Sequence, residues 1–128
     1  MKIAMISFTG NGRRLEKSLA HELEKEGHQV LQAVKCKELE SDKDAVKCSA
    51  REWTGEQIRT RDVLIFIGAV QIAVRLIASF IGSKTTDPAV LVLDEKGQYC
   101  IPILSGHIGG ANEMAERIAE MAGALPVI

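Results

Sequence analysis

Residues 105–112 combine the groups best suited to chemistry in one short segment: a hydroxyl side chain, an imidazole side chain and several glycines. Gly106, Gly109 and Gly110 let backbone N–H groups approach a ligand, because no Cβ stands in the way. The helix expected directly after them favours a carboxylate, a phosphate or a developing oxyanion at its N-terminus. His107 can take up a proton near neutral pH. We therefore expect this segment to bind an anion or to activate water.

A purely structural interpretation of the same segment stays open, in which the glycines form a tight turn and His107 bonds to a backbone carbonyl. Ser105 is a candidate nucleophile, but it is not part of the G-x-S-x-G elbow of serine hydrolases. A role as hydrogen-bond donor or helix cap is therefore the preferred interpretation for Ser105. Asn112 and Glu113 are typical of a helix start, and ligand binding is the second interpretation of Asn112.

Basic residues near other turns are candidate partners for an anionic ligand. Arg13 and Arg14 directly follow the turn at residues 9–12, and guanidinium groups pair well with carboxylates. Arg75 and Lys84 are further candidates of the same kind. The alternative for all four is an ordinary solvated surface residue.

Apolar runs that alternate with amphipathic stretches predict one three-layer α/β/α domain, with a mainly parallel, flavodoxin-like sheet and one β-hairpin. The recurrence of Leu15, Leu19 and Leu23 predicts a helix that stops at Gly27. Strands are expected at residues 3–8, 28–34, 63–67, 90–93, 99–104 and 125–128, further helices around 50–60, 72–80 and 112–122, and a surface loop or frayed segment at 35–47.

The hairpin turn at residues 94–97 decides where the candidate residues lie. Ligands of open parallel sheets bind at the carboxyl ends of the strands. We assume that the strand ending at Leu104 runs parallel to the first strand. The loops at residues 9–12, 68–71 and 105–110 then share one edge of the sheet, and the turn lies at the opposite edge.

Asp87 gains a candidate role from the same assumption. It precedes Pro88, which is a common position for a turn or cap residue. The strand expected at residues 90–93 would pair antiparallel with the strand that ends at Leu104, so it would begin beside His107. Asp87 comes shortly before that strand and would therefore orient the imidazole of His107. We therefore expect Arg13, Arg14, Asp87 and His107 to converge on one edge of the sheet.

The overall composition excludes some classes of protein. Sixteen Lys and Arg against seventeen Asp and Glu give a net charge of −1, which does not favour a nucleic-acid binder. The apolar runs are too short to span a membrane, and residues 1–6 are expected to be a strand rather than a signal peptide. Cys36, Cys48 and Cys100 form no C-x-x-C, so we expect neither a metal site nor disulfides, and a cytoplasmic location.

Residues 68–128 resemble a known family in several blocks. The most specific block is Leu104-Ser105-Gly106-His107-Ile108-Gly109-Gly110-Ala111-Asn112-Glu113, and residues 68–78, 84, 87–90, 94–97 and 126–128 follow the same pattern. They resemble the CbiG proteins of anaerobic cobalamin biosynthesis, the cobalt-precorrin-5A hydrolases. The match covers about half of the chain, and residues 1–61 follow it more loosely.

The resemblance implies that water opens the δ-lactone of a cobalt-bearing corrinoid and that a two-carbon unit leaves as acetaldehyde. His107 would activate the water, with Asp87 as its orienting partner and Ser105 beside them. Backbone amides of the glycine segment would bind the oxyanion or a substrate carboxylate. The anionic rim of the macrocycle would suit Arg13, Arg14, Arg75 and Lys84. No cofactor is expected, because the substrate itself carries the cobalt.

In the family this block forms the N-terminal part of a longer protein. The resemblance thus implies that residues 1–128 form one domain, and that a C-terminal domain or a partner chain completes the corrinoid site. A homodimer is compatible with the open sheet edges. Two alternatives stay open: a non-catalytic module that binds a tetrapyrrole or another polyanion, and a flavodoxin-like domain that binds a flavin or nucleotide.

Overall fold

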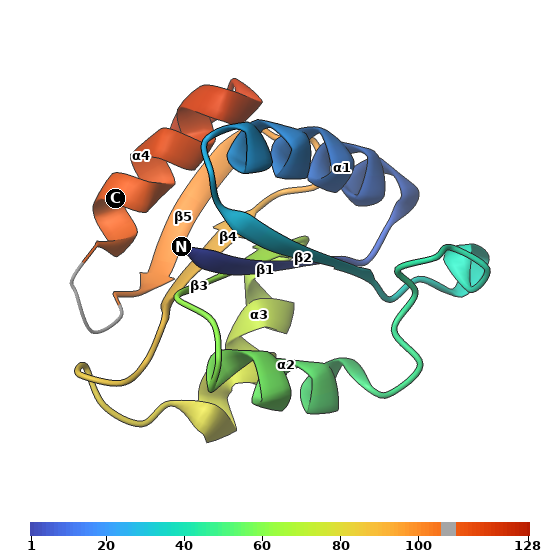
Figure 1. Cartoon of the computed structure of the whole chain (residues 1–128), viewed down its shortest axis with the longest axis horizontal. Coiled ribbons are helices and arrows are strands. Elements are labelled where there is room, and N and C mark those ends of the chain that lie inside the picture. Colours follow the sequence, from blue (N-terminus) through green and yellow to red (C-terminus); the bar gives the residue numbers. More distant parts are fainter. Residues whose placement is uncertain (106–109) are drawn as a thin grey trace.

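The computed structural model describes residues 1–105 and 110–128, and in this part of the chain six strands form one sheet with helices on both faces (Figure 1). The strands are β1 (Lys2–Ser7), β2 (Gln29–Val34), β3 (Val63–Ile67), β4 (Ala89–Leu93), β5 (Tyr99–Leu104) and β6 (Leu125–Pro126). The helices are α1 (Gly10–Lys25), α2 (Ala50–Ile58), α3 (Val70–Ile77) and α4 (Ala111–Ala122), with short 3₁₀ turns η1 (Lys37–Leu39) and η2 (Ala78–Phe80).

The predicted three-layer, mainly parallel α/β fold is confirmed. The strand order is β2-β1-β3-β4-β5-β6, and β1 to β4 all run in the same direction. β5 is antiparallel to β4, and β6 is parallel to β5. We call the edge where β1 to β4 begin the amino edge and the edge where they end the carboxyl edge. β5 therefore ends at the amino edge.

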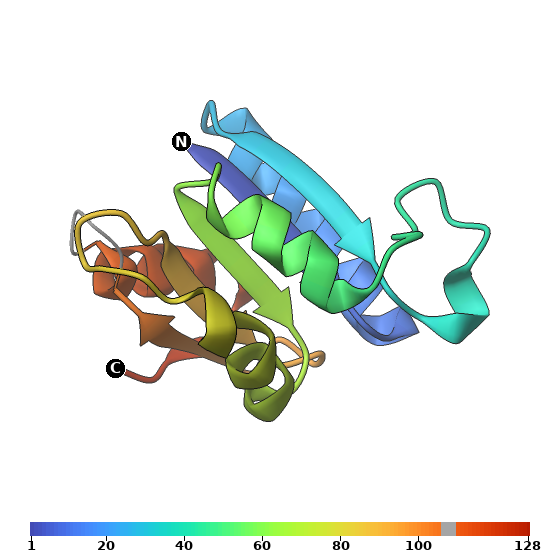
Figure 2. The same ribbon diagram turned by 90° about the horizontal axis from the view of Figure 1, so that it is seen from below.

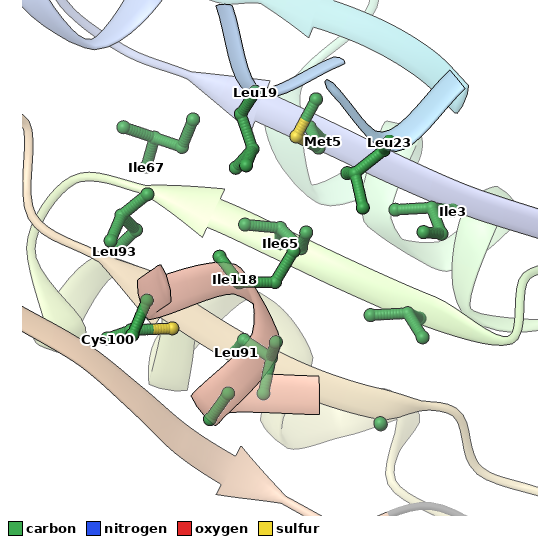
Figure 3. Packing of buried hydrophobic residues seen from close by; sticks show 14 of the residues in the cluster. Ile3, Met5, Leu19, Leu23, Ile65, Ile67, Leu91, Leu93, Cys100 and Ile118 are labelled. Carbon is green, nitrogen blue, oxygen red and sulfur yellow. The ribbon is translucent and has the colours of Figure 1, made fainter. Parts of the chain in front are cut away.

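Both faces of the central strands are buried, which explains their unbroken apolar runs. Ile3 and Met5 of β1 point to the side of α1 and α4, where they pack with Leu19 and Leu23 (Figure 3). Their neighbours in β1, Ala4 and Ile6, point to the other side, in a cluster with residues of α2 and α3. Successive side chains of a strand alternate between faces, so each strand contributes to both clusters.

The turn between β4 and β5 is held by one carboxylate. Asp94 accepts hydrogen bonds from the backbone N–H groups of Lys96, Gln98 and Tyr99, at 3.2, 2.9 and 2.6 Å. Gly97 has a φ of +68°, a conformation that glycine adopts without steric cost. This turn reverses the chain and fixes β5 antiparallel to β4, as the hairpin signal predicted.

The final strand is shorter than the predicted residues 125–128, because only Leu125 and Pro126 are paired with β5. The backbone N–H of Val127 still donates to the carbonyl of Cys100. The next donor of a parallel ladder would be residue 102 of β5, which is a proline without an N–H. The ladder therefore stops there. Among the described helices, none is long and apolar enough to cross a membrane.

Candidate functional site

The direction of β5 places the candidate residues at two opposite edges of the sheet. Leu104 pairs with Val90 near the start of β4, so Ser105 lies at the amino edge. Asp87 precedes β4 by two residues and lies at the same edge. Gly106, His107 and Gly109 lie outside the described residues. The expected proximity of the 84–87 segment to Ser105 thus agrees with the antiparallel pairing of β4 with β5.

The expected convergence with the two arginines is wrong. Arg13 and Arg14 lie in the first turn of α1, directly after β1, and therefore at the carboxyl edge. The loop at residues 68–71 follows β3 and lies at that edge as well. The error comes from the assumption that the strand ending at Leu104 is parallel to β1. A hairpin signal fixes the relative direction of its two strands, but not which of them follows the rest of the sheet.

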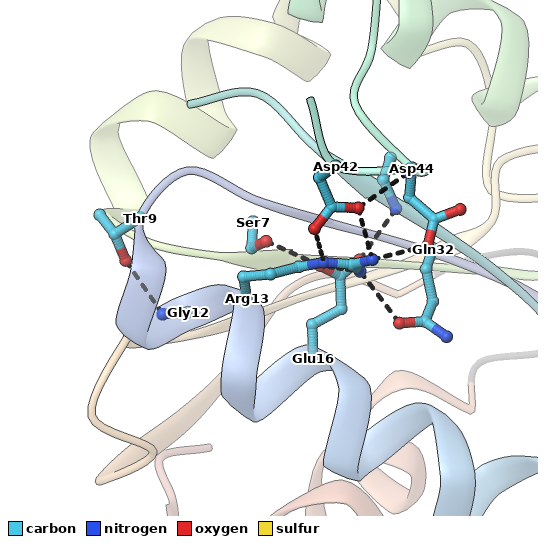
Figure 4. Close-up of polar contacts among 9 residues, drawn as sticks. Ser7, Thr9, Gly12, Arg13, Glu16, Gln32, Asp42 and Asp44 are labelled. Carbon is cyan, nitrogen blue, oxygen red and sulfur yellow. Dashed lines mark hydrogen bonds and ion pairs between the residues drawn. The ribbon is translucent and has the colours of Figure 1, made fainter. Parts of the chain in front are cut away.

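Arg13 is built into the fold and is not available to the rim of a ligand, because it is only 3% exposed. Its guanidinium contacts Glu16 at 3.2 Å, Asp42 at 2.9 Å and Asp44 at 2.6 Å (Figure 4). It also donates to the side-chain oxygen of Gln32 at 3.0 Å. Burial alone would lower the pKa of Arg13, but the bonds to the three carboxylates outweigh it and raise the pKa above its ordinary value.

Glu16 is the buried centre of this network. Its carboxylate accepts from the Ser7 hydroxyl at 2.7 Å and from the backbone N–H of Ala33 at 2.9 Å. Burial raises the pKa of Glu16 to about 7, although the bonds from Ser7, Ala33 and Arg13 act in the opposite direction. The network joins α1 to β1 and β2, and nothing in the sequence distinguished Glu16 from the surface glutamates of the same helix.

The remaining basic candidates are exposed and lie apart from one another. Arg14 is at the carboxyl edge, where it bonds to the side chain of Asn11. Arg75 lies within α3, which returns from the carboxyl edge along one face of the sheet. Lys84 lies in the segment that leads into β4 at the amino edge. Of the four basic residues, only Lys84 shares an edge with Ser105.

Asp87 closes the loop that carries Lys84. It is 7% exposed, and both of its carboxylate oxygens lie 3.0 Å from the backbone N–H of Gly82. The backbone N–H of Asp87 in turn donates to the carbonyl of Ser83 at 2.9 Å. Loop closure is the visible role of Asp87. Its carboxylate retains lone pairs for a further donor, because an ionised carboxylate has about four acceptor positions.

The start of α4 differs slightly from the prediction, since the helix begins at Ala111 instead of Asn112. Gly110 stands before it and provides no side-chain cap. Asn112 is exposed, and Glu113 provides the negative charge that is favourable in a first turn. Ser105 is also exposed. These residues therefore lie where a ligand at the amino edge has access to them.

A pocket of about 390 Å³ opens beside this helix start. Gly110, Glu113 and Met114 line it from α4 and the residue before it, and Asp62 and Ala89 line it from the starts of β3 and β4. Met1, Val63 and Arg117 complete the wall. Asp62 and Arg117 were not among the site residues predicted from the sequence. Asp62 directly precedes a parallel strand and therefore lies at the amino edge. This position indicates a site residue only once the amino edge is known to be the candidate edge.

Arg117 does not face the pocket as a free cation. Its guanidinium is paired with Glu26 of the segment after α1 and, at 3.4 Å, with Glu120. Asp62 accepts a hydrogen bond from the backbone N–H of Lys2 at 2.8 Å.

Within residues 1–105 and 110–128, no group of three His, Cys, Asp or Glu side chains is placed to hold a metal ion. Cys100 is buried, and burial raises the pKa of its thiol to about 11, which makes it a weak nucleophile.

Fold and site together define an α/β protein with a pocket at the amino edge of its sheet, next to the start of α4. Residues 52–128 match the family described as cobalamin synthesis G N-terminal. The chain belongs to this family.

Two curated relatives are named cobalt-precorrin-5A hydrolase. The protein from Salmonella typhimurium strain LT2 is 55% identical over 69 residues, which cover 54% of this chain and 20% of the relative. The protein from Priestia megaterium is 52% identical over 66 residues, which cover 52% of this chain and 17% of the relative. The chain thus matches about a fifth of the length of these relatives.

The fold is also found in a solved structure, a cobalamin biosynthesis protein G homologue from Sulfolobus solfataricus. The two chains superpose with a TM-score of 0.78 at 27% sequence identity. The match covers 99% of this chain and 36% of the other chain. The similarity therefore includes residues 1–51, which the family match leaves out.

Proposed function

We propose that this chain acts in cobalamin biosynthesis as part of a cobalt-precorrin-5A hydrolase, and that the amino edge of its sheet contributes to the corrinoid site. The observation that carries the proposal is the identity of 55% and 52% to two hydrolases of that name. The residues that flank His107 in sequence, Ser105 and Gly110, lie at this edge, and Gly110 lines the pocket.

His107 is the proposed base in this mechanism. It takes a proton from a water molecule as the water oxygen attacks the lactone carbonyl, and backbone N–H groups of the glycine segment stabilise the oxyanion that forms. The oxyanion collapses, the ester C–O bond breaks and the ring opens. Collapse of the released alkoxide then breaks a C–C bond and expels acetaldehyde. The electron pair of that bond stays on the macrocycle, which takes up the proton that His107 removed from water.

The remaining roles are assigned from where the structure places the side chains. Ser105 is exposed at the amino edge and donates a hydrogen bond to substrate or water, rather than acting as nucleophile. Lys84 and Asn112 contact carboxylates of the corrinoid rim. Asp87 holds the loop of Lys84 closed and has acceptor capacity left for an imidazole N–H. Arg13 takes no part, because its guanidinium is buried among carboxylates.

Acetaldehyde release tests this proposal directly. The chain is incubated with cobalt-precorrin-5A, alone and together with the remaining part of the Salmonella relative, and acetaldehyde is followed by its enzymatic reduction. We expect aldehyde from the combined sample. If neither sample yields it, the hydrolase assignment is wrong.

Replacement of His107 tests the mechanism within the same assay. His107→Ala should lower turnover by about 10²–10⁴-fold, the usual contribution of a general base. His21→Ala is the matched control, because His21 is exposed on α1 and should leave turnover unchanged. If His107→Ala retains full turnover but weakens corrinoid binding, the chain is a binding module and the base lies elsewhere in the protein.

A further inference from the structure

A second hollow lies at the opposite edge of the sheet from the proposed corrinoid site. Its volume is about 390 Å³, and it is formed at the end of β2 by Val34 and by the segment at residues 35–49 that connects β2 to α2. Figure 2 shows this segment projecting from the body of the molecule. We call this hollow the β2 pocket. Val34, Ala45 and Val46 give it apolar surface.

Most of the charged residues that line the β2 pocket are lysines. Lys35, Lys37 and Lys47 line it, together with a single carboxylate residue, Glu40. In the described part of the chain, none of these three lysines lies within ion-pair distance of a carboxylate. Their positive charges are therefore available to an anionic ligand.

The lysine ammonium groups that do have partners bond to neutral carbonyls. The Lys35 ammonium donates to the backbone carbonyls of Val46 at 3.2 Å and Cys48 at 2.9 Å. The Lys47 ammonium donates to the backbone carbonyl of Glu40 at 3.4 Å. An ammonium has three donors, so each of these groups keeps capacity for an anion while its position is fixed.

Two other acidic residues of the segment, Asp42 and Asp44, do not line the β2 pocket. Asp42 and Asp44 both pair with the buried guanidinium of Arg13, and the bond from Arg13 keeps the pKa of Asp42 below its usual range. The backbone of Val34 bonds to the segment in both directions, to Asp44 at 3.0 Å and from Val46 at 2.9 Å. The pocket walls are thus held by α1 and β2.

The connection between β2 and α2 is unusual in its length and in the bonds that fix it. Loops longer than about 12–15 residues without secondary structure of their own are uncommon in compact domains and are mostly either functional or disordered. Between β2 and α2, the 15 residues at 35–49 contain only the three-residue turn η1. This connection is fixed through a buried ion cluster, which contributes little net stability compared with apolar packing. It also lies at the carboxyl edge of parallel strands, where ligands of α/β sheets usually bind.

We propose that the β2 pocket binds a small molecule that carries a carboxylate or phosphate group on a short apolar body. The lysines bind the anionic oxygens, and Val34, Ala45 and Val46 contact the apolar part. Arg13 acts as a positioning residue, because it holds Asp42 and Asp44 and does not itself reach the ligand. This site is independent of the proposed hydrolase function and lies at the other edge of the sheet.

Amide chemical shifts of the whole chain report on this binding. The protein is titrated separately with inorganic phosphate and with tricarballylate, at constant ionic strength maintained with sodium chloride. We expect saturable shifts at the amides of residues 34–47 with at least one of the two anions, and the tighter one identifies the anionic group. Shifts that do not saturate with either anion overturn the proposal.

Two lysine variants distinguish a built pocket from general surface charge. Lys37→Gln combined with Lys47→Gln should raise the Kd at least about tenfold, because two charge-assisted contacts are lost. Lys43→Gln is the matched control, because Lys43 is an exposed lysine of the same segment that does not line the pocket. We expect it to change the Kd less than about twofold. Equal weakening by Lys43→Gln and the double variant overturns the proposal.

Discussion

At the carboxyl edge of the sheet, Arg13 is 3% exposed and contacts three carboxylates, whereas Lys84 and Ser105 at the amino edge are exposed. The two edges thus use polar residues in different ways. At the carboxyl edge, a buried network fixes a long connection to α1 and β2. At the amino edge, polar side chains surround a helix start and a pocket. Residue type alone does not separate these roles, because burial decides whether a guanidinium is free to bind a ligand.

The largest expected effect is on stability and comes from Arg13. Arg13→Ala leaves the Glu16 carboxylate buried without its cation, so the free energy of unfolding should fall by about 3–5 kcal/mol. Urea unfolding followed by circular dichroism measures this. Arg14→Ala, the same change at the exposed neighbouring residue, should stay within about 0.5 kcal/mol. Similar losses for both variants would contradict the contrast between a buried and an exposed arginine.

Glu16 should give the carboxyl edge a distinct pH dependence. Its pKa of about 7 in the folded chain lies above that of an unfolded glutamate, so the folded state holds the proton more tightly. Its stabilising contribution is complete below the unfolded pKa and is lost as the pH rises through about 7.

Urea unfolding at a series of pH values checks this expectation. The free energy of unfolding should fall between about pH 5 and pH 8 by an amount on the order of 2–3 kcal/mol. The side chain of Glu16→Gln cannot titrate, so this dependence of the free energy of unfolding on pH should disappear in the variant, whatever its absolute stability. A slope that persists in the variant would assign the titration to another group.

The turn that directs β5 toward the amino edge should show an intermediate effect. Asp94→Ala removes the acceptor of three backbone N–H groups, so we expect a loss of about 2 kcal/mol. Glu95→Ala, at the next position of the same turn, should change stability by less than about 0.5 kcal/mol. Thermal unfolding compares the two variants, and an unaffected Asp94→Ala would show that the turn forms without its carboxylate.

The smallest expected effect concerns Asp87 at the amino edge. Asp87→Ala loses the bond that closes the loop and should cost about 1 kcal/mol, whereas Asp87→Asn keeps an oxygen acceptor for the Gly82 N–H and should cost less. Chemical unfolding measures both. The turnover of Asp87→Asn is a second measurement, which tests whether Asp87 has a role beyond loop closure. Near-normal activity would limit Asp87 to loop closure, and a large loss would support a contact with the catalytic base.

Local signals predicted the elements well, because each depends on residues close in sequence. The spacing of Leu15, Leu19 and Leu23 predicted α1, and the turn residues at 94–97 predicted the hairpin. The length of β6 was overestimated, because its pairing depends on Pro102 in another strand. The pairing of Arg13 with Asp42 and Asp44 was not predictable for the same reason, since these residues lie 29 and 31 positions away along the chain.

The sequence by itself determined the alternation of strands and helices, the buried runs of the central strands and the segment that resembles the hydrolase family. These follow from periodicity, turn chemistry and residue order, which are local properties of the chain. Only the tertiary structure decided that β4, and not β5, runs with β1. That choice depends on pairing between distant strands, and it separates the arginines of α1 from Ser105 by placing them at opposite edges of the sheet.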